Sequence, residues 1–147
     1  GADDAAILYQ EHAKKAGIKI NVVREPSDGY WSNVWTVKEF VMCYWSGRPT
    51  EDLMFSIAYA AGGPWNDTKW NNKKFNQLLV AARAELDEKK RAQMYAEMQE
   101  ICKDDGGTIV PMFAQIVEAS SDKIGHGTIS GHMEADGQRN AERWWFK

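Results

Sequence analysis

The sequence has few of the residues that build metal sites and covalent crosslinks. It contains three histidines and two cysteines, and His12, His126 and His132 do not have the spacing of metal ligands. Cys43 falls in a strand-like run and Cys102 on a helical apolar face, which favours two buried thiols over a disulfide. We therefore expect no metal site and no disulfide.

The sequence also lacks the motifs of common enzyme classes. No Gly-x-Ser-x-Gly elbow, phosphate-binding glycine loop or His-Glu-x-x-His helix occurs. Glu51 and Asp52 are adjacent, and neighbours on an extended segment point to opposite faces, so they do not predict a shared acid and base. One group of titratable residues is typical of a solvated loop: His126, His132, Glu134 and Asp136. We expect a protein that is not an enzyme and needs no cofactor.

Neither a long apolar run nor an excess of one charge is present. No stretch approaches the roughly 20 apolar residues that span a bilayer. The net charge is -3 and the basic residues are scattered, which argues against nucleic acid as a partner. The start, Gly1 to Ala5, has no basic segment, apolar run or cleavage pattern, so we expect any signal peptide to be absent from this chain.

Aromatic residues, in contrast, are abundant. Seven tryptophans, five tyrosines and five phenylalanines occur among 147 residues, and aromatic side chains serve both as core and as walls of ligand pockets. A chain of this length fits one domain, which we place at 1–147, and can bury roughly 70% of the surface of its unfolded form. The excess of aromatics points to a binding role.

The first part of the chain alternates between helical and strand patterns. Apolar residues at helical spacing and then in alternation predict a helix over 5–16 that ends at Gly17 and a strand over 18–22. Ser27 is placed to cap a short aromatic helix with Tyr30, Trp31 and Trp35. The continuous apolar run at 40–45 predicts a strand covered on both faces.

The second part begins with glycine, proline and polar residues, and we expect 46–72 to be mostly loop. Apolar stripes then predict two helices, over 75–86 and 94–102, with Asp87 capping the second. The run 108–113 predicts an edge strand or a bulge, because a proline within it cannot donate to a ladder. A polar tail begins near 120. This alternation predicts an α/β fold with an open mixed sheet flanked by helices.

The first candidate ligand-binding cluster lies where the apolar strand ends. Ligands of open α/β sheets lie beyond the carboxyl ends of strands. Arg48 could hold a carboxylate with two parallel hydrogen bonds, between stacking walls formed by Tyr44 and Trp45. The alternative is that Arg48 pairs with Glu51 or Asp52 at the surface and Trp45 belongs to the core.

The second candidate cluster is the segment Trp65-Asn66-Asp67-Thr68-Lys69-Trp70. Its indoles and amide and hydroxyl groups suit recognition of a polar solute, which makes Trp65, Asn66, Asp67 and Trp70 ligand-binding candidates. The alternative is that Asp67 or Thr68 caps the following helix and that the tryptophans cover the core.

The order of these segments resembles the C-terminal part of the peptide/nickel-type (family 5) extracellular solute-binding proteins of ABC importers. The resemblance runs from about Ala5 to about Phe113 and more loosely to the end. It rests on five segments in this order: the strand with Trp45, the loop 65–70, the segment Asn72 to Leu79, the helix with Arg91 and Tyr95, and the strand from Ile109 to Phe113.

The resemblance implies the second, C-terminal lobe of a two-lobed periplasmic-binding-protein-like (type II) fold. An α/β core would span about 5–119 and a returning tail about 120–147. Such proteins lie outside the cytoplasm, in the periplasm or its equivalent, close over a small solute such as a peptide or opine, and deliver it to the permease subunits in the membrane. This chain would then need the N-terminal lobe of the same receptor to complete its site.

Two residues receive a role from the resemblance. In peptide-binding members the tryptophan of this strand lines the pocket, which maps onto Trp45. Those members place an aspartate for the peptide amine three positions later, where this sequence has Arg48. The sign of the charge is reversed, so we expect a carboxylate-bearing solute. The competing hypothesis is a protein-interaction module with a tryptophan-rich surface.

Overall fold

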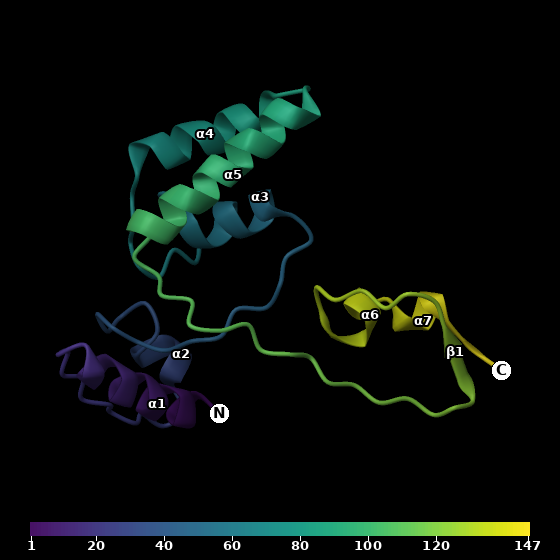
Figure 1. Cartoon of the computed structure of the whole chain (residues 1–147), viewed down its shortest axis with the longest axis horizontal. Helices are drawn as coiled ribbons and strands as arrows, with labels where there is room; N and C mark the ends of the chain where they lie inside the picture. The colour runs from purple at the N-terminus through teal and green to yellow at the C-terminus, as the bar shows by residue number, and fades with distance from the viewer. The chain divides into compact units, whose positions relative to one another are not determined.

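The computed structural model describes all residues, 1–147, and shows a helix-rich chain with one two-stranded antiparallel sheet (Figure 1). The chain separates into two compact units, Gly1–Trp45 and Ser46–Lys147, and each is described by itself. The sequence does not predict this boundary, and the single domain over 1–147 stays a prediction. None of the helices combines the length and apolar character that a membrane crossing requires.

The first unit contains helix α1 (Ala2–Lys15) and the single turn α2 (Tyr30–Asn33). The predicted first helix is confirmed, and Gly17, with φ of 79°, adopts the left-handed conformation expected just after its end. The predicted cap of the aromatic helix is wrong, because α2 begins after Gly29 and has no side-chain cap.

The two strands predicted in the first unit do not form. Residues 18–22 and 40–45 belong to no ladder. Single side-chain contacts hold them instead: Gln10 Nε2 donates to Ile20 O at 2.7 Å, and the Tyr30 hydroxyl donates to Met42 O at 2.7 Å. A strand needs a partner to satisfy its backbone, and no other segment pairs with these two.

The second unit is built around helices α4 (Lys73–Ala84) and α5 (Glu88–Asp105), which lie side by side in Figure 1. Asn72 caps α4 by accepting from Phe75 N at 3.0 Å, so the cap proposed at Asp67 or Thr68 is wrong. Asp87 caps α5 as predicted, by accepting from Lys89 N and Lys90 N. Both caps satisfy backbone N–H groups that the first helical turn leaves unpaired.

Residues 46–72 are mostly loop, as predicted, but 51–59 within them are helical, which the prediction did not include. Helix α3 (Glu51–Met54) starts at Thr50, whose hydroxyl accepts from Leu53 N at 3.3 Å. It continues as the π-helical segment η1 (Phe55–Tyr59). Phe55 and Ala58 bury one face of this segment, and that burial favours a helix over an irregular loop.

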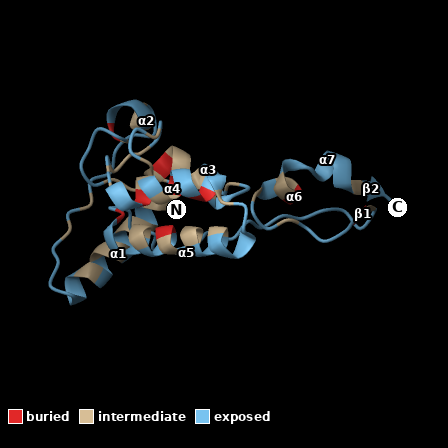
Figure 2. Cartoon of the chain, turned by 90° about the horizontal axis from the view of Figure 1, so that it is seen from above, coloured by how far each residue is buried: buried red, intermediate tan, exposed pale blue.

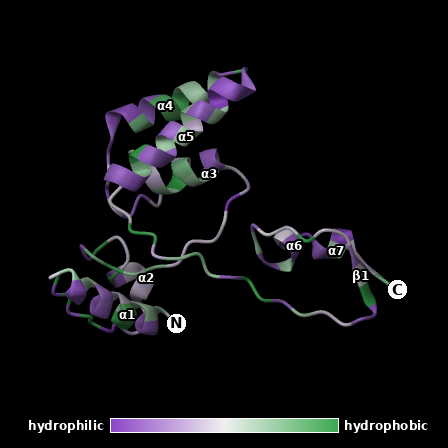
Figure 3. Cartoon of the chain, viewed as in Figure 1, coloured by the Kyte–Doolittle hydropathy of each residue, from purple (hydrophilic) through white to green (hydrophobic).

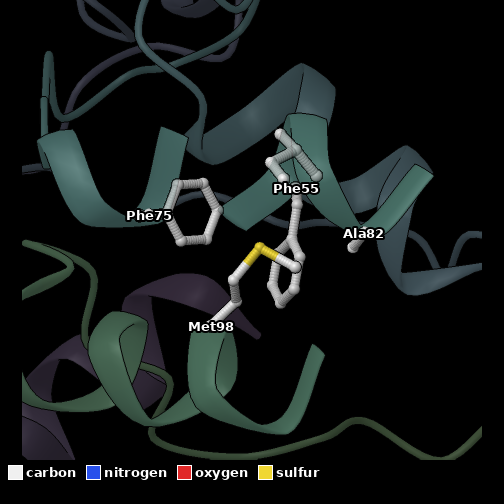
Figure 4. Close-up of a cluster of buried hydrophobic side chains, with 5 residues drawn as sticks. Phe55, Phe75, Ala82 and Met98 are labelled. Atoms are coloured by element: carbon white, nitrogen blue, oxygen red, sulfur yellow. The ribbon is translucent and has the colours of Figure 1, made fainter. Parts of the chain in front are cut away.

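The core of the second unit lies between η1, α4 and α5. Its buried members are Phe55, Phe75, Leu79, Ala82 and Met98. In Figure 4 the rings of Phe55 and Phe75 and the Met98 side chain point toward one another, and the Phe55 and Phe75 ring centroids are 5.2 Å apart at an interplanar angle of 76°. Figure 3 shows the matching alternation of hydrophobic and hydrophilic residues around α4 and α5.

Residues 107–121, after α5, form an irregular segment without helix or strand, and each of these residues is exposed (Figure 2). The strand predicted over 108–113 does not form, although its side chains are apolar. The exposed fraction reaches 92% for Phe113. The predicted open sheet of several strands therefore does not form, and the sheet of this chain has two strands.

The C-terminal segment carries the sheet, in which β1 (Ile124–His126) pairs antiparallel with β2 (Trp144–Phe146). Between them lie the short turns α6 (Glu134–Gln138) and α7 (Asn140–Arg143). Asp136, expected in a solvated loop, is only 1% exposed. It accepts from Ser130 N at 2.6 Å and from Trp144 Nε1 at 3.0 Å and pairs with Arg143, which satisfies the buried carboxylate.

Neither cysteine forms a disulfide, as predicted, and both are half-buried rather than fully buried. Burial raises the pKa of the Cys102 thiol to about 12. Because the thiolate is the nucleophile, we expect Cys102 to react with iodoacetamide at pH 8 about a hundredfold or more slowly than an ordinary exposed cysteine with a pKa of about 8.5. Mass spectrometry of the labelled peptide over time measures this rate in the folded chain, with the denatured chain as control. Equal rates in both would contradict the burial.

Candidate functional site

The structure brings together two residues from different candidate clusters, Arg48 and Trp65. The guanidinium carbon of Arg48 lies 6.0 Å from the centroid of the Trp65 ring, at the outer range of a cation–π contact. Nη1 of Arg48 also donates to the carbonyl oxygens of Ser46 and Gly47, each at 2.9 Å. Trp65 is 46% exposed, so the pair lies at the surface.

The pair is carried by the helix formed by α3 and η1. Arg48 stands two residues before the cap residue Thr50, and Trp65 N donates to Ile57 O at 2.9 Å. An open surface depression lies at the N-terminal end of the helix and is lined by Arg48, Pro49, Thr50, Glu51 and Met54. Arg48 thus lines this shallow, solvent-accessible surface and also contacts the Trp65 indole.

Asn66 holds the loop that carries Trp65. Its Nδ2 donates to the carbonyl oxygens of Ala60 and Trp70 at 3.1 and 2.7 Å, and its Oδ1 accepts from Trp70 N at 3.2 Å. Asn66 is half-buried. These bonds join the two ends of the loop 60–70, so the Asn66 side chain stabilises the conformation of the loop.

Trp70 covers the core of the second unit. Its ring packs on Phe75 at 5.0 Å and on Tyr59 at 6.4 Å between centroids. Its Nε1 donates to Asp105 Oδ2 at 3.0 Å, and Asn72 donates to the same oxygen. The bonds from Asn72 and Trp70 lower the pKa of the Asp105 carboxyl below its usual range. Trp70 therefore matches the alternative in which a tryptophan covers the core.

The remaining candidates lie elsewhere. Tyr44 and Trp45 are in the first unit, where Tyr44 is 66% exposed and Trp45 is half-buried. Asp67 is half-buried in the loop between Trp65 and Trp70. A ligand-binding role for these residues stays a prediction. No group of three or more histidine, cysteine or acidic side chains is arranged to hold a metal ion.

A polar network that no sequence pattern predicts is centred on Asp52. Arg83 on α4 donates to both carboxylate oxygens, Nε to Oδ2 at 2.8 Å and Nη2 to Oδ1 at 3.0 Å. The Tyr95 hydroxyl on α5 donates to Oδ2 at 3.0 Å, and Ser56 Oγ donates to Oδ1 at 3.2 Å. Arg83, and not Arg48, is thus the cation that forms this bidentate pair with Asp52.

The network shifts the titration of its members. The hydrogen bond from Arg83 is the main cause that lowers the pKa of Asp52. The same bond raises the pKa of Arg83, and burial followed by the bond to Asp52 raises that of Tyr95. Asp52, Arg83 and Tyr95 are far apart in the sequence, and local patterns carry no signal for such a contact.

Comparison with models of protein families found no match, and comparisons with curated proteins and with solved structures found no significant match. The resemblance to family 5 solute-binding proteins therefore rests on the order of its segments alone.

Proposed function

We propose that this chain is part of the extracytoplasmic solute-binding protein of an ABC importer of the peptide/nickel type, and that its solute carries a carboxylate. In this proposal the chain supplies the C-terminal lobe, and the N-terminal lobe of the same receptor completes the site. The protein captures the solute outside the cytoplasm, as in a periplasm, and delivers it to the permease subunits. It performs no catalysis.

The observation that carries the proposal is a mismatch between sequence and structure in two apolar segments. Residues 40–45 and 108–113 have the composition of strands, yet each lies extended and outside any ladder. Phe40 is 67% exposed in the first segment, and Phe113 is more exposed still in the second. Apolar segments of strand composition that lie outside any ladder and expose side chains such as these would be covered if they joined a larger sheet.

The resemblance to family 5 solute-binding proteins suggests which sheet these segments would join. In a lobe of the type II fold, these segments would be strands of an open mixed sheet flanked by helices, completed by chain that this sequence does not contain. Helices α4 and α5 would then cover one face of the sheet. The buried helical core and the two apolar segments outside any ladder support this arrangement.

The solute class follows from Arg48. A guanidinium that lies over an indole meets an anion through its edge, where planar N–H groups match the two oxygens of a carboxylate. The contact with Trp65 and the bonds to Ser46 and Gly47 orient this group. An ammonium group would be repelled at the same position, which disfavours peptides held by their N-terminus.

A thermal-shift screen of the receptor that contains this chain tests the proposal. We expect stabilisation by carboxylate-bearing solutes such as opines, acidic sugars and peptides, at about 2.7 kcal/mol when the solute is at 100 times its Kd. No stabilisation by any solute in the screen, with cationic and neutral solutes included, would contradict the importer function. Stabilisation only by cationic or neutral solutes would contradict the role of Arg48.

Arg48→Gln provides the residue-level test. We expect the affinity for the carboxylate solute to fall about ten- to a hundredfold, because a charge-assisted pair contributes about 1.5–3 kcal/mol. Titration calorimetry measures the Kd. The control is Arg24→Gln, which removes an exposed arginine paired with Asp3 at the surface. Equal affinities of Arg48→Gln and the control would show that Arg48 does not hold the solute.

The second candidate function is a protein-interaction module, which the exposed apolar segment after α5 also favours. Ile109, Phe113 and Val117 are all more than half exposed there. Such side chains, gathered in one segment, suit the docking of another polypeptide. A receptor that binds no small solute in the thermal-shift screen would favour this function.

A further inference from the structure

Asp52 connects three helices through one carboxylate. It belongs to α3, its bidentate pair reaches Arg83 on α4, and its third bond reaches the Tyr95 hydroxyl on α5. The Asp52 side chain is 29% exposed, so water competes only in part for these bonds. A bidentate pair fixes orientation as well as distance, which a single hydrogen bond does not.

The helix that Asp52 fixes also carries both members of the Arg48 and Trp65 pair. Arg48 precedes its first turn, and Trp65 is bonded to Ile57 in its last turn. Any rotation or sliding of this helix therefore moves the backbone that carries the Arg48 guanidinium and the Trp65 indole.

The helix cannot hold its own position. It spans only residues 51–59, and helices shorter than about 12–15 residues are marginal by themselves. Phe55 and Ala58 bury one face against the core, but apolar contacts are non-directional and tolerate small rotations. The bonds of Asp52 to Arg83 and Tyr95 are directional and join this helix to both α4 and α5.

We infer that Asp52 is a positioning residue for the candidate site, whose bonds to Arg83 and Tyr95 hold the helix 51–59 so that the Arg48 guanidinium stays over the Trp65 indole. The consequence for solute affinity rests on the proposed function. The effect on the geometry of the pair does not, because it concerns contacts within the chain.

The inference includes a dependence on pH. The charged and titratable groups that face Asp52 are Arg83 from α4 and Tyr95 from α5, with Glu51 beside it on its own helix. Arg83 holds the pKa of Asp52 below its usual value. The ion pair of Asp52 and Arg83 should therefore persist at any pH above the ordinary pKa of an aspartate. As the pH falls through the lowered pKa, protonation of Asp52 breaks the ion pair, and the contact between Arg48 and Trp65 should then loosen.

Fluorine NMR of the whole chain labelled with 5-fluorotryptophan tests this inference without any solute. Trp65→Phe identifies the Trp65 resonance, and Arg48→Gln defines its position when the guanidinium is gone. We expect Asp52→Asn to move the resonance toward that position. Asp104→Asn, which neutralises an exposed aspartate on α5, is the control and should leave it in place.

An unmoved Trp65 resonance in a folded Asp52→Asn chain, checked by circular dichroism, would overturn the inference. If that variant does not fold, acidification of the wild-type chain provides the test. Its Trp65 resonance should shift at a higher pH than the one at which the circular dichroism changes. Simultaneous changes would show that Asp52 has no positioning role apart from the stability of the fold. The double variant Asp52→Arg with Arg83→Asp exchanges the two charges. A Trp65 resonance at its wild-type position in this variant would support the role of the ion pair between positions 52 and 83.

Solute binding then separates this inference from the proposed function. We expect Asp52→Asn in the receptor to weaken carboxylate binding in the same direction as Arg48→Gln. A moved Trp65 resonance in a receptor that binds no carboxylate would leave the positioning role intact and contradict the proposed function. Unchanged affinity in a receptor that does bind one would contradict the link from Asp52 to the solute.

Discussion

Replacing Phe75 with alanine is expected to lower the free energy of unfolding of the second unit by about 3–5 kcal/mol. Phe75 is completely buried, and its ring contacts those of Phe55 and Trp70 within the cluster that includes Met98. The substitution removes the contacts of the ring and leaves a cavity that three helices can only partly close. This loss is a large share of the 5–15 kcal/mol that typical domains possess.

Urea denaturation followed by circular dichroism at 222 nm measures the change. Val80→Ala is the matched control, because Val80 lies on the same helix but is 68% exposed. We expect it to change the free energy of unfolding by no more than about 0.5 kcal/mol. A Phe75→Ala variant as stable as the Val80→Ala variant would mean that the cluster around Phe75 is not the core.

Asn66→Ala is the second substitution with a large expected effect, a loss of about 2–3 kcal/mol in the free energy of unfolding. The side chain of Asn66 bonds both the N–H and the carbonyl of Trp70, together with the carbonyl of Ala60. Removing it leaves several half-buried backbone groups without partners, and each such group costs free energy when water cannot reach it fully.

The same denaturation experiment measures this loss, with Asn71→Ala as control. Asn71 is an exposed asparagine five residues later, with one surface bond to Asn76, and its replacement should be close to neutral. Asn66→Asp keeps the acceptor oxygen but loses the donor, so it should fall between the two. Equal stability of the Asn66→Ala and Asn71→Ala variants would show that the loop does not depend on Asn66.

The helices could be predicted because their signals are local. The cap at Asp87 and the glycine after α1 lie within a few residues of the turns that they end or begin. The apolar spacing of α4 and α5 repeats with the period of the helix itself, so a short window of sequence contains it. Apolar spacing alone does not locate the end of a helix. Leu86 fits the apolar stripe predicted over 75–86, but it lies beyond α4 and is 90% exposed.

The strands could not be predicted in the same way. An apolar run such as 40–45 satisfies the composition of a strand, but a strand exists only when another segment supplies the hydrogen bonds of its ladder. The pairing that does form joins Ile124 to Phe146 and Gly125 to Trp145. Both segments are only three residues long, too short for a recognisable alternation.

The candidate site was predicted in parts. Arg48 and Trp65 were each identified from the chemistry of their own segment, but their contact spans a helix that the sequence analysis missed. The partners of Asp52 were also missed, since 31 residues separate it from Arg83 and 43 from Tyr95. Pairing across such distances depends on how helices dock, which a single sequence does not encode in any local pattern.

The short connection between α4 and α5 also bears on the order in which the unit folds. Only residues 85–87 separate the two helices, so their packing closes a small loop and should be fast. Docking of the helix 51–59 needs contacts with residues much further along the chain, which costs more loop entropy. We therefore expect the helical pair to form first, and the Arg48 and Trp65 pair to take shape among the last events of folding.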